Sequence, residues 1–136
     1  MSQDQDGFDL VRSLELFLQE VEGYAPVEVI RSFRLQLPVT DPAWIKALVL
    51  ALREGLTNGI RHGQAGRFEF SLEQVEGELR FTLWNSGIPY DGRPAGFGLA
   101  SMEERVRQLG GILSLKGDSS RGGSVLSIRI PKEGGS

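Results

Sequence analysis

Apolar residues recur at helical spacing in three stretches of the chain, each bounded by residues that start or stop helices. Asp41-Pro42 is a strong start, because aspartate can cap a helix and proline needs no amide partner in the first turn. Gly23 and Gly110 supply the stop signals for the other two. The pattern predicts helices over residues 8–22, 42–62 and 99–109.

Between the helical stretches, apolar and polar residues alternate in shorter runs. Glu76-Gly77 separates two of these runs and suits a tight hairpin. The runs predict strands at residues 27–37, 68–72, 79–83, 112–116 and 124–130. This order predicts an α+β fold, a two-layer sandwich in which helices cover one face of a mixed, mostly antiparallel sheet.

Length and composition indicate one domain of ordinary globular character. The chain has 136 residues, of which 40% are hydrophobic and 24% charged. We expect a folded domain at residues 8–131, with a disordered tail at 1–7 and a second tail at 132–136. The net charge of −3 argues against nucleic-acid or anionic-membrane partners. The absence of cysteine excludes disulfides, thiolate metal sites and a cysteine nucleophile.

The apolar runs are far shorter than the ~20 residues that a membrane span needs, and no secretory signal follows Met1. We therefore expect a cytoplasmic domain without direct membrane insertion.

The predicted central helix carries more polar chemistry than packing requires. Its apolar stripe is expected to consist of Ile45, Leu48, Leu52, Leu56 and Ile60. Glu54 and Asn58 are four residues apart and share another face, which Arg61 and His62 continue. Such a face could line a magnesium–phosphate site or be an ordinary solvated face, and the helix alone leaves both open.

Three glycine-containing segments follow this helix. Gly96-Phe97-Gly98-Leu99 precedes the last helix, where glycines let an anion approach the backbone amides. Asn85-Ser86-Gly87 ends an apolar strand at a place where a polar side chain could read a base edge. Gly122-Gly123-Ser124 leads into the last strand. Taken singly, each could be a helix cap or a turn.

In combination the segments resemble the ATP-binding catalytic domain of sensor histidine kinases, within the gyrase, chaperone, histidine-kinase and mismatch-repair ATPase superfamily with its Bergerat-type fold. Residues 53–62 are similar to its N box, and residues 85–87 and 96–99 to its two glycine boxes. Residues 100–106, Leu109-Gly110-Gly111 and the eight residues between Gly87 and Gly96 are typical of the short-lid subfamily that includes nitrate sensors.

The resemblance implies a role for each matching residue. Asn58 would coordinate Mg²⁺, and Glu54 would orient a metal-bound water or help to activate the nucleophile. Asn85 would meet the adenine amino group, supported by Ser124. The nucleotide-binding set would comprise Asn58, Arg61, His62, Asn85, Gly87, Gly96, Gly98, Leu99 and Ser124.

Two residues depart from the family pattern. Asn85 replaces the usual aspartate, and Pro89 stands where the first glycine box has its second glycine. An asparagine Oδ1 can still accept from the adenine amino group while Nδ2 donates to N1, but the charge that strengthens the first bond is lost. We expect ATP binding with reduced affinity, under a mobile lid at residues 88–95.

The implied activity is ATP- and Mg²⁺-dependent transfer of the γ-phosphoryl group to a histidine on a separate dimerisation helix. A response regulator would be an indirect partner, and the chain could be the cytoplasmic part of a membrane-bound sensor. His62, the only histidine, would contact phosphate and not serve as the acceptor. The alternatives are a stand-alone anti-sigma-type serine kinase and a nucleotide-sensing interaction module without transfer activity.

Overall fold

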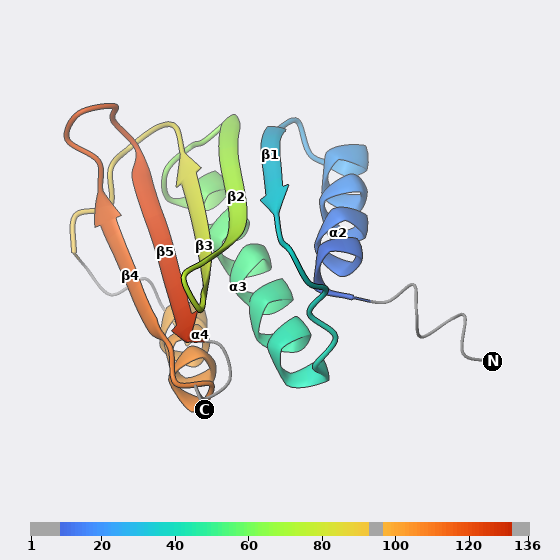
Figure 1. Cartoon of the computed structure of the whole chain (residues 1–136). Coiled ribbons are helices and arrows are strands. Elements are labelled where there is room, and N and C mark those ends of the chain that lie inside the picture. The colour runs from blue at the N-terminus through green and yellow to red at the C-terminus, as the bar shows by residue number, and fades with distance from the viewer. Residues whose placement is uncertain (1–8, 93–96, 132–136) are drawn as a thin grey trace.

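The computed structural model describes residues 9–92 and 97–131, and the predicted tails lie outside these ranges. Within them, three helices gather on one side of a five-stranded sheet (Figure 1). In chain order the elements are α2 (Leu10–Tyr24), β1 (Glu28–Arg34), α3 (Pro42–Arg61), β2 (Arg67–Val75), β3 (Glu78–Asn85), α4 (Phe97–Gln108), β4 (Ile112–Gly117) and β5 (Ser124–Pro131). The predicted two-layer α+β fold is confirmed.

The sheet is mixed and mostly antiparallel, as the sequence predicts. Its strand order is β1-β2-β3-β5-β4, in which only β1 and β2 pair in parallel. The hairpin between β2 and β3 turns at Glu76 and Gly77, whose φ angles are 49° and 81°. Two consecutive left-handed residues match the twist of the flanking strands.

The core lies between the sheet and the helices. Every second residue of β2, β3 and β5 points toward the helices, which is the alternation expected of a sheet with one buried face. The fully buried residues of this layer include Leu10, Leu14, Leu18, Leu48, Leu52, Phe68, Leu72, Phe81, Ile128 and Ile130.

The first helix is displaced from its predicted limits by two residues at each end. Asp9 caps it by accepting a hydrogen bond from the Arg12 amide at 3.0 Å. At the other end, the predicted stop at Gly23 is wrong. The helix continues to Tyr24, and the amide of Ala25 still donates to the Val21 carbonyl oxygen.

The predicted stripe of the central helix is buried at Leu48, Leu52 and Leu56, partly buried at Ile45, and wrong at its end. Ile60 is 38% exposed, and Gly59 faces the sheet in its place. A Cβ on Gly59 would lie only 2.7 Å from the Phe68 ring. Because the helix backbone lies this close to the sheet at Gly59, the following residue is rotated toward solvent.

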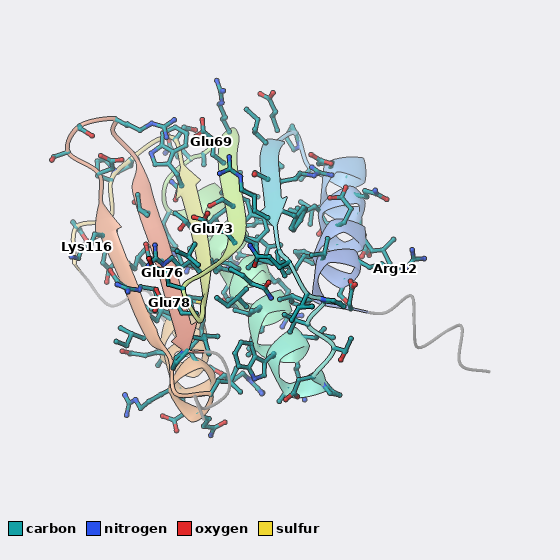
Figure 2. All side chains as sticks on the ribbon, in the orientation of Figure 1. Arg12, Glu69, Glu73, Glu76, Glu78 and Lys116 are labelled. Atoms are coloured by element: carbon teal, nitrogen blue, oxygen red, sulfur yellow. The ribbon has the colours of Figure 1, made fainter. Side chains whose placement is uncertain are left out.

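The other face of the sheet carries polar and charged side chains, among them Glu69, Glu73 and Glu78 (Figure 2). Glu78 accepts hydrogen bonds from Arg80 and from Arg129, at 2.6 and 2.8 Å. These bonds lower the pKa of the Glu78 carboxyl, the one from Arg129 having the larger effect. In the parts of the chain that the structure describes, no helix has both the length and the apolar character needed to cross a membrane.

Candidate functional site

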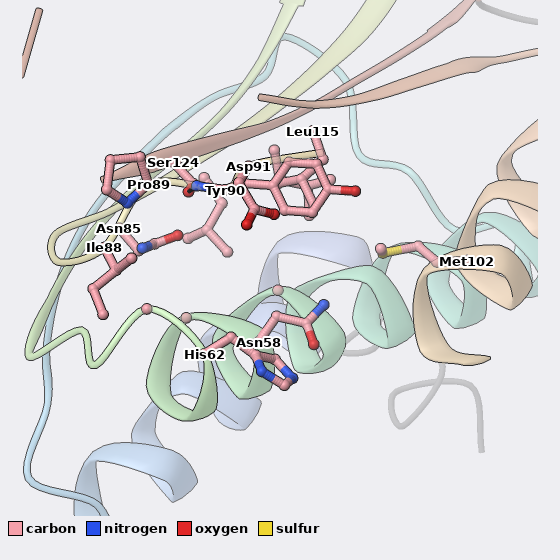
Figure 3. A pocket seen from close by; sticks show the side chains of 15 residues that line it. Asn58, His62, Asn85, Ile88, Pro89, Tyr90, Asp91, Met102, Leu115 and Ser124 are labelled. Atoms are coloured by element: carbon pink, nitrogen blue, oxygen red, sulfur yellow. Dashed lines mark hydrogen bonds between the residues drawn. The ribbon is translucent and has the colours of Figure 1, made fainter. Parts of the chain in front are cut away.

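A cavity of about 320 Å³ lies between α3 and the end of the sheet where β3 finishes and β5 begins (Figure 3). Four residues singled out from the sequence line it together. Asn58 and His62 come from α3 and its C-cap, Asn85 from the end of β3, and Ser124 from the start of β5. Its size falls at the lower end of the range for small-molecule sites.

Two glycines of α3 let the helix backbone approach the sheet closely beside this cavity. A Cβ on Gly55 would lie 2.6 Å from the Leu83 side chain, and one on Gly59 would meet Phe68. Neither position has room for a larger residue, so the helix backbone rests directly on the strands. Asn58 and His62, next to this line of contact, are thereby presented to the cavity.

Asn85 and Ser124 are register partners across β3 and β5, and both are buried. The Asn85 Nδ2 donates to the Ser86 carbonyl oxygen at 2.8 Å, while its amide oxygen points into the cavity (Figure 3). The expected donation from Nδ2 to a base nitrogen therefore competes with a backbone acceptor. Close strand pairing is possible because residue 123 is glycine: a Cβ there would overlap the Asn85 carbonyl oxygen.

The Ser124 hydroxyl has a backbone partner that the sequence did not indicate. Its Oγ accepts a hydrogen bond from the Tyr90 amide at 2.7 Å. The Ile88 amide donates to the Gly63 carbonyl oxygen at 2.8 Å, and a Cβ on Gly117 would lie 2.8 Å from the Tyr90 carbonyl oxygen. Residues 88–90, expected to belong to the lid, are thus attached to the sheet and to the end of α3. Residues 93–95 lie outside the described ranges.

Four further lining residues come from the segment that the sequence predicts to be a mobile lid, without a role for any single side chain: Ile88, Pro89, Tyr90 and Asp91. They follow Asn85-Ser86-Gly87 directly, so their place next to a strand end was the available signal. Tyr90 and Asp91 bring an aromatic ring and a carboxylate to the cavity (Figure 3).

The other predicted residues that the structure describes are not part of the cavity lining. Glu54 is half-buried, and its carboxylate lies where a Cβ on Gly98 would project. Leu99 packs against the core, and Arg61 is exposed on the last turn of α3. Gly87 has φ of 102° and lies against Gly63, where a Cβ would overlap the carbonyl oxygen. Gly96 lies outside the described residues.

The turn that leads to Ser124 is held by Arg121 on the polar face of the sheet. Its guanidinium lies 3.8 Å from the centre of the Trp84 ring and donates to both carboxylate oxygens of Glu69, at 3.0 and 2.9 Å. The hydrogen bond from Arg121 lowers the pKa of the Glu69 carboxyl. Trp84 adds a hydrogen bond from Nε1 to the Gly122 carbonyl oxygen at 3.0 Å. These contacts fix the start of β5 and with it Ser124.

Comparison with known proteins assigns the chain to a family. Residues 45–134 match the family described as histidine kinase-, DNA gyrase B-, and HSP90-like ATPase. Over 82 residues, 59% of this chain, the sequence is 33% identical to the signal transduction histidine-protein kinase/phosphatase UhpB of Salmonella typhimurium. The matched part is only 16% of the length of that relative.

Solved structures share the fold. The histidine kinase domain of the E. coli osmosensor EnvZ superposes with a TM-score of 0.71 at 19% identity, covering 93% of this chain and 88% of that domain. The ATP-binding domain of PrrB from Mycobacterium tuberculosis gives 0.67 at 21% identity, covering 93% and 96%. At these identities the likeness establishes the fold.

Proposed function

The chain belongs to the family of histidine kinase-, DNA gyrase B-, and HSP90-like ATPases, and from this membership we propose that it is the catalytic domain of a two-component sensor kinase. In this proposal it binds ATP with Mg²⁺ and transfers the γ-phosphoryl group to a histidine on a separate dimerisation helix. A response regulator would then receive the group. The short-lid subfamily that includes nitrate sensors stays a prediction.

One observation carries the proposal: α3 and the β3–β5 strand ends bring Asn58, His62, Asn85 and Ser124 to a single cavity. The buried Asn85 amide suits the base edge of a nucleotide. Asn58 and His62, on the opposite wall, suit its phosphates. This placement of the side chains on two opposite walls orients the proposed nucleotide. Its adenine would lie against the sheet, and its phosphates would lie along α3 toward the start of α4.

The donor set fits a cation that arrives with the nucleotide. Among the described residues, no three His, Asp or Glu side chains gather as a metal site. Mg²⁺ commonly uses one or two protein oxygens together with phosphates and water, so Asn58, with Glu54 acting through water, would hold it. The ion would neutralise charge on the transferring phosphoryl group.

Glu54 is our candidate for the group that activates the acceptor. The acceptor imidazole nitrogen forms a bond to the γ-phosphorus, the bond from that phosphorus to the bridging oxygen of ADP breaks, and ADP leaves with the electron pair. Glu54 accepts the proton that the imidazole loses. Its place beside Gly98 at the start of α4 supports this role, because free helix amides there favour phosphate.

The acceptor histidine is proposed to lie on a partner helix. His62 is the only histidine of this chain, it caps α3, and it lines the cavity. From that position it would contact phosphate, with Arg61 as a further cation near the end of the same helix. We further propose that the domain acts in the cytoplasm as part of a membrane-bound sensor, without nucleic-acid partners.

The test is phosphoryl transfer between separate polypeptides. The protein is mixed with γ-labelled ATP, Mg²⁺ and a dimerisation-helix fragment that contains the acceptor histidine. Acid-labile label on the fragment is expected. Glu54→Gln should keep near-normal ATP affinity and lose transfer by ~10²-fold or more, since the amide keeps the size but not the charge.

Other results would select the alternatives. ATP binding without transfer to any histidine fragment would indicate a nucleotide-sensing module. Acid-stable label on a protein serine would indicate an anti-sigma-type serine kinase.

A further inference from the structure

Asn85 alone would recognise the edge of adenine only weakly. Its side chain is neutral, and its Nδ2 already donates to the Ser86 carbonyl oxygen at 2.8 Å. What it presents to the cavity is one amide oxygen from a residue that is 8% exposed (Figure 3). A neutral acceptor makes a weaker hydrogen bond than a carboxylate does.

A carboxylate reaches the same cavity from another segment. Asp91 lines it from the stretch after β3, and Figure 3 shows its carboxylate pointing into the space that also receives the Asn85 amide. The adjoining backbone is held by the hydrogen bond from the Tyr90 amide to Ser124 Oγ at 2.7 Å. Gly117 packs against the same Tyr90 backbone. Asp91 follows this anchored residue directly and is exposed at the cavity.

Two acceptors that face one cavity call for a ligand edge that carries donors. The exocyclic amine of adenine has two hydrogens, one for each acceptor. Guanine has a carbonyl oxygen at that position, which two facing acceptors would repel. Two acceptors facing the cavity therefore favour a purine with an amine at this position, because its hydrogens can bond to both. They disfavour a purine with a carbonyl oxygen there, because that oxygen is repelled and both acceptors stay unpaired.

Building on the proposed function, we propose that Asp91 is a specificity-determining residue that accepts a hydrogen bond from the adenine amine opposite Asn85. The carboxylate that the family pattern puts at residue 85 is supplied here by residue 91. Asn85 and Asp91 together then distinguish adenine from guanine.

The first experiment measures nucleotide affinity in Asp91→Asn by calorimetry with Mg²⁺. ATP affinity is expected to fall about ten- to a hundredfold, the effect of losing a hydrogen bond to a charged group. Purine riboside triphosphate, which lacks the amine, should bind both proteins equally. Glu20→Gln, an exposed change of the same charge on α2 away from the cavity, is the control and should bind ATP like the original protein.

Sugar recognition is the competing role for this carboxylate. A loss in Asp91→Asn that persists with purine riboside triphosphate and disappears with 2′- or 3′-deoxy-ATP would show that Asp91 binds the ribose, and would overturn the proposal.

A second experiment moves the carboxylate between the two positions. In the Asp91→Asn background, Asn85→Asp should restore ATP affinity about tenfold, because one charged acceptor returns to the base edge. In the original background the same change should give no gain, because two carboxylates would then face each other across the cavity. Asn85→Asp also alters the contact with Ser86, but this effect on ATP affinity is present in both backgrounds and cancels when the two are compared.

The outcomes separate this proposal from the one on which it rests. Equal gains from Asn85→Asp in both backgrounds, or unchanged ATP affinity in Asp91→Asn, would remove the role of Asp91 and leave ATP binding intact. Failure of the original protein to bind ATP with Mg²⁺ would overturn both.

Discussion

The carboxylate of Glu54 fills the space that a side chain at residue 98 would need. A Cβ built on Gly98 would overlap Glu54 Oε1 and lie 2.7 Å from Cδ, and the three nearest atoms all belong to that one side chain. Gly98 lies in the first turn of α4 and does not have the left-handed backbone that usually requires glycine. The position of the carboxylate therefore explains the glycine at residue 98. It also brings the Glu54 side chain of α3 into contact with the start of α4.

Gly98→Ala should separate catalysis from stability. The new methyl group would displace the end of a flexible side chain and no backbone, while alanine favours the helix by about 1 kcal/mol over glycine. We expect an unchanged or slightly higher melting temperature. Phosphoryl transfer should fall about tenfold or more, because Glu54 is the proposed proton acceptor and a small shift of such a group is costly. Thermal unfolding and the transfer assay measure both. Full transfer activity in this variant would show that the Glu54–Gly98 contact has no part in the reaction.

Asn58→Ala should weaken Mg²⁺-dependent nucleotide binding while the domain stays folded. Asn58 lines the cavity and is absent from the hydrophobic core, so the change removes the proposed Mg²⁺ ligand and no core packing. The expected loss is roughly 1–3 kcal/mol of ATP binding free energy when Mg²⁺ is present, and much less with EDTA. Calorimetry under both conditions tests this. Equal ATP affinity of the variant and the original protein in Mg²⁺ would mean that this helix face is an ordinary solvated surface.

Most of the fold could be predicted because hydrophobic periodicity determines it locally. The period-two runs of β2 and β3, for example, need no distant partner to be recognised as strands. The wrong position in the central helix has a tertiary cause. Ile60 fits the helical stripe, yet the close approach of Gly59 to Phe68 turns it to solvent, and no local pattern encodes that distance.

The site was less predictable than the fold. Asn58 and Asn85 were indicated by family motifs, and the structure places both at the cavity. Tyr90 and Asp91 belong to a stretch without periodicity, so their place depends on the hydrogen bond to Ser124, a residue 34 positions away from Tyr90. Such contacts follow from the path of the backbone, which a single sequence does not display.

Two glycines in helices provide a matched stability test. In Gly59→Ala the Cβ would lie 2.7 and 2.9 Å from Phe68 ring atoms in a filled core, whereas in Gly23→Ala nothing lies within 4 Å. Overpacking costs about 1–3 kcal/mol and outweighs the helical gain at residue 59, while residue 23 should gain about 0.5–1 kcal/mol. Urea unfolding of the two variants should thus move in opposite directions. A stabilised Gly59→Ala would contradict the close packing of α3 on the sheet.

The last prediction concerns Arg31, which joins β1 to α2. Its guanidinium lies 2.6 Å from carboxylate oxygens of both Glu15 and Glu22, whose side chains are 33% and 31% exposed. Arg31→Leu would leave the two carboxylates without this cation. Partial solvent screening limits the expected loss to about 1–2 kcal/mol at pH 7, between the values for exposed and buried pairs. Arg34→Leu, at an exposed position on the same strand, is the control and should change stability by less than about 0.5 kcal/mol.

The effect of Arg31→Leu should depend on pH in a defined direction. The hydrogen bond from Arg31 lowers the pKa of the Glu15 carboxyl below its usual value of 4.5, against a smaller opposing effect of burial. A group with a depressed folded-state pKa stabilises the protein above its unfolded pKa and loses that contribution as the pH falls through the folded value. The free-energy difference between Arg31→Leu and the original protein is measured by urea unfolding at constant ionic strength. It should be largest at pH 7 and shrink as the pH falls below the usual carboxyl pKa of 4.5. A difference that stays constant from pH 7 to pH 3 would mean that the arginine stem stabilises by packing, and that its charge contributes little.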